Sequence, residues 1–273
     1  MTDLKGKRIF VTGGSRGIGL AIALRAARDG AAICIAAKTA EPHPKLPGTI
    51  YTAAAEIAAA GGRALPLVCD ARDEGQLEAA VNKAAEAFGG LDICINNCSA
   101  IQLTGTLETD MKRYDLMHDI GPRATFAASK FCLPHLLQGD NPHILTLSPP
   151  IGMAHEWFGR WPAYTTAKYG MSLITLGLSQ EFAGRVAANA LWPRTIIATA
   201  AIRNLGGGGL EKGARTPEIM ADAAHAVLTK PAADFTGRFL IDEALLRDEG
   251  VTDFDRYACV PGEELQIDLF VDE

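Results

Sequence analysis

The chain has 273 residues and a net charge of −6, and 48% of its residues are apolar. This length and composition predict one large domain or two small ones with a substantial core, and the absence of a basic stripe argues against nucleic-acid binding. No apolar run reaches the ~18 residues that a membrane span needs, and residues 1–8 do not resemble a secretory signal.

The cysteines and histidines of the chain give no sign of a metal site. The cysteines form no C-x-x-C motif, and the histidines show no ligand spacing. Because most cysteines stand in apolar stretches, we expect buried free thiols, a reducing compartment, a cytoplasmic location and no bound metal. The cysteines are Cys34, Cys69, Cys94, Cys98, Cys132 and Cys259.

Short apolar runs alternate with alanine-rich helical stretches along the chain. The predicted strands cover 8–12, 32–37, 64–70, 91–96, 143–147, 186–191 and 239–242. The predicted helices cover 17–30, 52–60, 74–88, 123–137 and about 164–183. A further helix is expected after Thr216, which would cap it, with Pro217 at the first helical position.

This alternation predicts the fold class. Apolar strands without alternation indicate a sheet that is covered on both faces. Repeated βα units then predict an α/β fold, a doubly wound parallel sheet of the Rossmann type. Segments 42–49 and 204–215 are expected to be loops within a single domain that covers 1–273.

A glycine turn follows the first predicted strand. Residues 12–19 read TGGSRGIG, which places Gly13, Gly17 and Gly19 in the pattern G-x-x-x-G-x-G. Glycines allow the backbone to approach a pyrophosphate, and the start of the next helix supplies N–H donors and a positive dipole. The turn therefore predicts a dinucleotide cradle, which also includes Ser15 and Ile18.

The end of the second predicted strand bears on the choice of cofactor. NAD sites usually place an acid there for the ribose 2′-hydroxyl, whereas here Lys38 follows the strand. With Arg16 in the glycine turn, two cations favour the 2′-phosphate of NADP(H); alternatively, Lys38 is only a solvated lysine. Asp70 is expected either to accept from the adenine amino group or to be a cap or loop carboxylate. Asn97 is expected to brace the turn or to bind the cofactor ribose.

Tyr164 and Lys168 are four residues apart within a predicted helix, so they share one helix face. A lysine ammonium beside a phenol lowers the phenol pKa from its usual value of about 10. Such a tyrosine can exchange a proton with a carbonyl or hydroxyl oxygen. The spacing also fits an ordinary amphipathic helix, but the glycine turn upstream favours a catalytic site.

Together these residues resemble the short-chain dehydrogenase/reductase family over essentially the whole chain. The resemblance rests on the glycine turn, Asp70, the asparagines at 96–97, the Tyr–Lys pair, and Pro193 after the sixth predicted strand. Residues 147–150, 163–172, 189–193 and 268–272 resemble the hydroxysteroid-dehydrogenase-like branch. Larger members of that branch carry a sterol-carrier domain, for which we expect no room in this chain.

The resemblance implies roles for individual residues. Tyr164 would donate the proton in reduction, Lys168 would lower its pKa and bind the nicotinamide ribose, and Ser148 would polarise the substrate oxygen. Pro193 would line the cofactor site, and Ile196 would contact the nicotinamide amide through its backbone. The resemblance also implies a homodimer or homotetramer and a mobile substrate lid around 199–215, for which a plain flexible loop is the alternative.

Three departures from the family pattern concern the site. Pro149 replaces the second of two common serines, which leaves open whether Ser148 is catalytic or structural. Gly121 stands where an asparagine usually supports a water relay to the lysine, so the relay is rerouted or impaired. Cys98 and Ser99 replace Ala-Gly, and they either reshape the pocket wall or only pack.

We therefore expect an NADP(H)-dependent oxidoreductase that interconverts a carbonyl and a secondary alcohol on an apolar small molecule. Trp157, Phe158 and Trp161 would wall the pocket or only pack in the core. One rival is an inactive dinucleotide-binding scaffold or sensor, which Gly121 and Pro149 favour. The other is an acyl-CoA-type double-bond reductase, against which the retained Tyr–Lys pair argues.

Overall fold

The computed structural model describes residues 3–44, 46–206 and 209–271. In these ranges seven strands form one parallel sheet in the order β3-β2-β1-β4-β5-β6-β7. This is the strand order of a doubly wound Rossmann-type fold with one strand added at the edge. The strands are β1 Arg8–Thr12, β2 Ala32–Ala37, β3 Arg63–Val68, β4 Ile93–Asn96, β5 His143–Thr146, β6 Ala187–Trp192 and β7 Phe239–Ile241.

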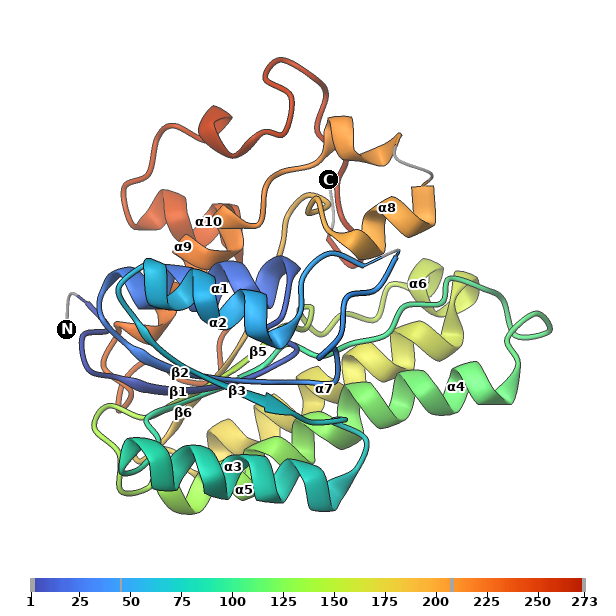
Figure 1. Cartoon of the computed structure of the whole chain (residues 1–273). Coiled ribbons are helices and arrows are strands. Elements are labelled where there is room, and N and C mark those ends of the chain that lie inside the picture. The colour runs from blue at the N-terminus through green and yellow to red at the C-terminus, as the bar shows by residue number, and fades with distance from the viewer. Residues whose placement is uncertain (1–2, 45, 207–208, 272–273) are drawn as a thin grey trace.

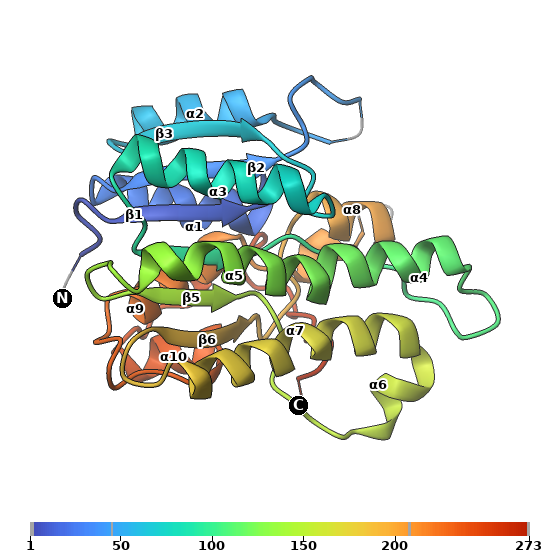
Figure 2. The same cartoon turned by 90° about the horizontal axis from the view of Figure 1, so that it is seen from below.

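Helices cover both faces of the sheet. In Figure 1, α1, α2, α9 and α10 lie above the sheet, and α3, α5 and α7 lie below it. Figure 2 shows α5 and α7 from below, with α4 continuing the line of α5. No helix in the described ranges is long and apolar enough to cross a membrane. The helices are α1 Gly17–Arg28, α2 Ile50–Ala59, α3 Glu74–Phe88, α4 Met111–His118, α5 Ala124–Leu136, α6 His155–Arg160, α7 Pro162–Glu181, α8 Ala200–Gly206, α9 Glu218–Leu228 and α10 Asp242–Asp248.

The strands are continuously apolar because both faces of the sheet are buried. In β2, Ile33, Cys34 and Ile35 are all fully buried, although neighbouring side chains in a strand point to opposite faces. Ile33 and Ile35 pack in the core that includes α1, α2 and α9, whereas Cys34 packs in the core that includes α3 and α5. The predicted α/β doubly wound sheet is confirmed.

Most predicted elements are confirmed, and β1, β2 and α3 have the predicted bounds. The helix predicted from 123 differs, because helical backbone already begins at Met111 and includes a π-helical turn, Asp119–Arg123. Gly121 and Pro122 lie in this turn. Since proline lacks the N–H of the regular helical bond, the wider turn allows the backbone to pass it without a break.

Two predicted details are wrong. Thr216 does not cap α9: its N–H donates to Tyr257 O at 2.7 Å, and Pro217 takes the N-cap position. The last strand ends at Ile241, and Asp242 begins α10, where its carboxylate accepts two backbone N–H groups. The short helices α6, α8 and α10 were also not predicted.

The two segments predicted as loops lie between strands of the same sheet, the first between β2 and β3 and the second between β6 and β7. Segment 42–49 leads from β2 to α2, which Thr49 caps. Segment 204–215 contains the end of α8 and a 3-10 turn, Leu210–Gly213. Lys45, Gly207 and Gly208 fall outside the described residues, and the lid around 199–215 stays a prediction.

Candidate active site

The glycine turn between β1 and α1 has no room for side chains at its closest approaches. A Cβ at Gly19 would lie 2.5 Å from Asn97 Nδ2 and 2.8 Å from Gly13 O, and a Cβ at Gly13 would lie 2.9 Å from Cys98 Sγ. Gly13 and Gly17 also have φ angles of +72° and +57°, which glycine adopts without steric cost. These three glycines therefore allow the turn to lie directly against the end of β4.

Asn97 holds the turn in place. Its Nδ2 donates to Thr12 O at 3.1 Å and to Gly13 O at 3.0 Å, and its backbone N–H donates to Thr12 Oγ1 at 3.1 Å. Of the two roles considered for Asn97, these bonds are those of a brace for the turn. The neighbouring Asn96 instead donates to Ser129 Oγ at 3.0 Å, which ties β4 to α5.

The start of α1 is suited to an anion. Arg16 is at the N-cap but makes no side-chain cap, and no acidic residue stands in the first turn. Ser15 is buried beside the turn, and Ile18 packs against the core and anchors the helix. Helix N-termini bind phosphates through free N–H groups and the helix dipole. The residues present therefore fit the pyrophosphate of a dinucleotide.

Arg16 and Lys38, the two cations predicted to favour NADP(H), have different surroundings. Lys38 is exposed just after β2. Arg16 is partly buried, and its guanidinium donates to Pro47 O at 2.8 Å and to Gly48 O at 3.0 Å. Arg16 thus holds the loop before α2 against the glycine turn, and Lys38 is the freer of the two charges.

The carboxylate of Asp70 forms an ion pair with Arg72. The Arg72 guanidinium donates to it at 2.9 Å and 2.5 Å, and these bonds help to lower the pKa of Asp70 to about 2. The N-cap of α3 is Asp73 rather than Asp70. Asp70 is therefore an ionised loop carboxylate, and an adenine amino group would have to share it with Arg72.

Tyr164 and Lys168 lie one turn apart near the start of α7, whose first residue is Pro162. Each is only 5% exposed. Lys168 Nζ donates to Leu147 O at 3.0 Å and lies 4.8 Å from the centre of the Trp192 ring. The helix therefore carries the ammonium to the carboxyl ends of β5 and β6.

Burial controls the charge states of the pair. It lowers the pKa of the Lys168 ammonium to about 8. It raises the pKa of the Tyr164 phenol, and the Asp268 carboxylate adds to the rise. This direction is opposite to the one predicted from the spacing, because water is excluded from the phenol and the ammonium is directed at Leu147 O. The phenol is held protonated, which is the form that a proton donor needs.

Ser148 follows β5 and is fully buried. Within the described part of the chain its Oγ has no hydrogen-bond partner, although buried hydroxyls are normally paired. The adjacent Pro149 carbonyl accepts from Ser172 Oγ at 2.7 Å, which fixes the loop to α7. An unpaired hydroxyl next to the carbonyl that binds Lys168 is available to a substrate oxygen.

The residues after β6 contact the last part of the chain. Ile196 N–H donates to Gln266 O at 3.0 Å, so the group predicted to bind the nicotinamide amide is already paired. Arg194 O accepts from Asp268 N–H at 3.0 Å. Pro193, between these contacts and β6, is buried. Before the Ile196 N–H could bind a nicotinamide amide, its hydrogen bond to Gln266 O would have to break.

Gly121 faces α7 beside the Tyr164–Lys168 pair. A Cβ there would lie 3.6 Å from Met171 Sδ and 3.8 Å from Ala167 O. Met171 Sδ in turn lies 4.0 Å from Lys168 Nζ. The position that aligns with the family asparagine therefore adjoins the lysine, and Met171 fills part of the space into which an amide would extend.

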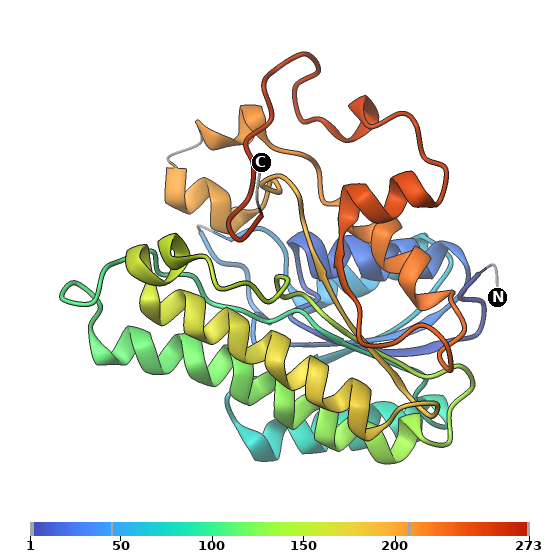
Figure 3. The same ribbon diagram turned by 180° about the vertical axis from the view of Figure 1, so that it is seen from behind.

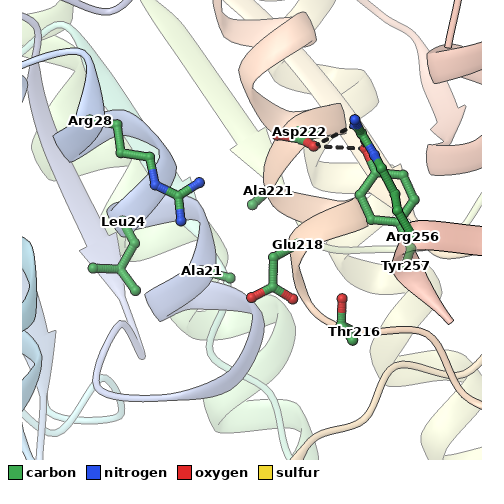
Figure 4. Close-up of a pocket in the computed structure, with 9 residues that line it drawn as sticks. All are labelled: Ala21, Leu24, Arg28, Thr216, Glu218, Ala221, Asp222, Arg256 and Tyr257. Atoms are coloured by element: carbon green, nitrogen blue, oxygen red, sulfur yellow. Dashed lines mark hydrogen bonds and ion pairs between the residues drawn. The ribbon is translucent and has the colours of Figure 1, made fainter. Parts of the chain in front are cut away.

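Two cavities open beside α1 and away from the Tyr–Lys pair. One of about 430 Å³ lies between α1 and α9, and Arg28 and Glu218 extend toward it (Figure 4). The other, of about 250 Å³, is lined by Arg16 and Thr199 among others. Tyr164 lines neither of these two cavities.

A glycine cradle at a helix start, at the carboxyl edge of a doubly wound sheet, defines a dinucleotide-binding protein of the Rossmann class. The model of the short chain dehydrogenase family matches residues 7–206. The chain thus belongs to the short-chain dehydrogenase/reductase family of oxidoreductases, within its hydroxysteroid-dehydrogenase-like branch.

Close relatives support this assignment. Hydroxysteroid dehydrogenase-like protein 2 of Xenopus tropicalis is 60% identical over 270 residues, which cover 99% of this chain and 64% of the length of that protein. A putative dehydrogenase from Xanthomonas campestris is 58% identical, with a TM-score of 0.97 over 99% of this chain and 100% of that one. A short chain dehydrogenase from Burkholderia cenocepacia J2315 in complex with NADP is 26% identical, with a TM-score of 0.74 over 87% of this chain and 96% of that one.

Sequence reasoning missed the residues that cover the pair. Asp268 and Phe270 come from the end of the chain and lie beside Tyr164. The resemblance of 268–272 to one branch of the family was the available signal, but it does not say where that segment folds.

Proposed function

We propose that the protein is an NADP(H)-dependent oxidoreductase that interconverts a carbonyl and a secondary alcohol on an apolar substrate. The observation that supports this most directly is the burial of Tyr164, Lys168 and the unpaired Ser148 hydroxyl at one edge of the sheet. Bound nicotinamide would supply or accept the hydride. Ser148 Oγ would donate to the substrate oxygen, Tyr164 Oη would exchange the proton with it, and the Lys168 ammonium would stabilise the phenolate.

Preference for NADP(H) is supported by charge. Lys38 is exposed at the end of β2, and no acid occupies that strand end. Arg16 adds positive charge at the glycine turn while it holds the loop before α2. The Burkholderia relative was crystallised with NADP, which agrees with this choice.

A scaffold or sensor that binds a dinucleotide without turnover is the second candidate. It is favoured by Gly121, which stands where the family pattern has an asparagine, and by Pro149, which replaces the second common serine. Turnover of NADPH with a panel of ketones separates this candidate from an oxidoreductase.

The deciding experiment replaces Tyr164 by Phe, which keeps the ring and removes the transferable proton. We expect kcat to fall by about 10²–10⁴-fold, with the dissociation constant for NADPH unchanged. Tyr51→Phe is the matched control, because Tyr51 is 54% exposed on α2. A Tyr164→Phe enzyme that keeps wild-type kcat would exclude the phenol as the proton donor.

Exposed apolar side chains on α5 and α7 support a homodimer or homotetramer. Phe126 is 55% exposed, Leu173 56% and Leu176 37%, and these helices lie on the same face of the sheet (Figure 2). Exposed apolar clusters commonly mark protein–protein contacts. Light scattering on wild type and on Phe126→Glu would report whether this face is the interface.

A further inference from the structure

The C-terminal segment, 266–271, returns to the carboxyl edge of the sheet. Figure 3 shows this last, dark-red part of the chain running beside α8 toward the sheet. Four hydrogen bonds fasten it to the loop after β6, to Trp192 and to the segment after α8. They are Gln266 N–H to Gly213 O at 2.8 Å, Ile196 N–H to Gln266 O at 3.0 Å, Asp268 N–H to Arg194 O at 3.0 Å and Trp192 Nε1 to Leu269 O at 2.7 Å.

Phe270 lies at the centre of an aromatic cluster. Its ring centre is 5.5 Å from that of Trp157, 5.4 Å from Tyr169, 5.9 Å from Trp192 and 5.9 Å from Tyr164. The residue is only 7% exposed. Aromatic pairs at such distances are attractive beyond the burial of their area.

The backbone at Phe270 is strained. Its φ is +66°, a left-handed conformation that costs a residue with a side chain roughly 1–2 kcal/mol. Such conformations persist where the surrounding structure imposes them, and they gather at functional sites. The aromatic contacts and the Trp192 bond to Leu269 O oppose this cost. The ring position is therefore specified by the fold and is not the product of a loose chain end.

The phenyl ring lies against the phenol that the proposed reaction uses. The Tyr164 and Phe270 rings are stacked, with 27° between their planes, and Tyr164 is 5% exposed. A carbonyl compound that brings its oxygen to the phenol must carry its substituents past this ring. Its apolar part would then contact Phe270 and the other aromatic rings around it.

We propose that Phe270 is a specificity-determining residue, and that the C-terminal segment forms the wall of the substrate pocket facing Tyr164. The proposal rests on the proposed function, since it concerns the substrate of the same site. The aromatic wall selects flat or small apolar carbonyl compounds. The segment opens for ligand exchange, which also frees Ile196 N–H from Gln266 O.

The first test reports the position of the C-terminal segment and does not depend on enzymatic activity. All three tryptophans of the chain, Trp157, Trp161 and Trp192, lie in or beside this cluster. Phe270→Ala should raise the acrylamide quenching constant of their fluorescence. Tyr51→Ala, which removes an exposed ring from α2, is the matched control and should leave it unchanged. Equal quenching in wild type, Phe270→Ala and the control would overturn the proposed wall.

The second test measures specificity by binding. Dissociation constants are determined for ketones of increasing size, from acetone to an aryl naphthyl ketone, in the presence of an oxidised nicotinamide dinucleotide, which cannot reduce them. Phe270→Ala should improve the affinity for the largest ketones relative to the smallest by about 10-fold or more, since hydrophobic pockets discriminate by roughly this factor. Phe270→Leu should give an intermediate shift, and it serves if the alanine variant does not fold.

The outcomes separate the two proposals. The same change for every ketone in both variants would make Phe270 structural and would overturn its role in specificity. Graded binding without turnover by the wild type would contradict the proposed oxidoreductase, while the role of Phe270 in ligand selection would stand.

Discussion

Gly19→Ala tests whether the close approach of the glycine turn to Asn97 serves dinucleotide binding. The new methyl carbon would lie 2.5 Å from Asn97 Nδ2 and 2.8 Å from Gly13 O. Rotation of a side chain does not relieve the second contact, because Gly13 O belongs to the backbone. Asn97 Nδ2 also donates to Thr12 O and Gly13 O, so moving it breaks the brace of the turn.

Two opposing effects decide the magnitude. Alanine in a helix is favoured over glycine by about 1 kcal/mol. Overpacking costs about 1–3 kcal/mol, and each lost hydrogen bond costs about 1 kcal/mol. The overpacking and the two lost hydrogen bonds outweigh the gain in helix preference, so we expect the free energy of unfolding to fall by about 2–4 kcal/mol. If half of this strain is expressed in the cradle, the dissociation constant for NADPH should rise about tenfold.

The assay pairs Gly19→Ala with Gly177→Ala. Gly177 is an exposed glycine in α7, and a Cβ there meets no atom within 4 Å. The same substitution should there stabilise the fold by about 0.5–1 kcal/mol and leave cofactor binding unchanged. Urea unfolding and titration of NADPH fluorescence measure both quantities. The reasoning is refuted if Gly19→Ala behaves like Gly177→Ala in both.

Three other predictions concern charge and space. Lys38→Asp should lower the preference for NADPH over NADH at least ~10-fold, and an unchanged ratio of dissociation constants would contradict the role of Lys38. In Gly121→Asn the new Cβ would make an ordinary contact with Met171 Sδ at 3.6 Å, and the amide beyond it takes additional space, so KM should rise for large ketones only; unchanged kinetics on every ketone would remove Gly121 from the site. Burial raises the pKa of Asp268 to about 7, while Lys168 lowers it and Asp242 raises it. Because this pKa lies above the unfolded value of about 3.9, its contribution to stability is complete at low pH and is lost as the pH rises through about 7. Asp268→Asn, which does not titrate, should therefore gain in melting temperature relative to wild type as the pH rises from about 4 to 7, and curves that stay parallel over this range would contradict this.

The local sequence pattern was sufficient to predict the sheet and the glycine turn. Buried strands such as 32–37 are short apolar runs, and their bounds follow from where apolar residues stop. The turn at 12–19 is readable because glycine is the residue that tolerates positive φ and a backbone in contact. The i to i+4 spacing likewise placed Tyr164 and Lys168 on one helix face.

Contacts between segments that are distant in the sequence determined the features of the site that local pattern does not predict. Arg16 bonds to the loop at Pro47 and Gly48, and Phe270 covers Tyr164 from the other end of the chain. The direction of the pKa shift of Tyr164 depends on the burial of its phenol, because desolvation is caused by neighbouring residues that the local spacing does not reveal. Composition and periodicity determined the class of fold and placed Tyr164 and Lys168 on one helix face, since these depend on residues close in sequence. Only the tertiary structure determined that Phe270 covers Tyr164, because these two residues are about a hundred positions apart in the sequence.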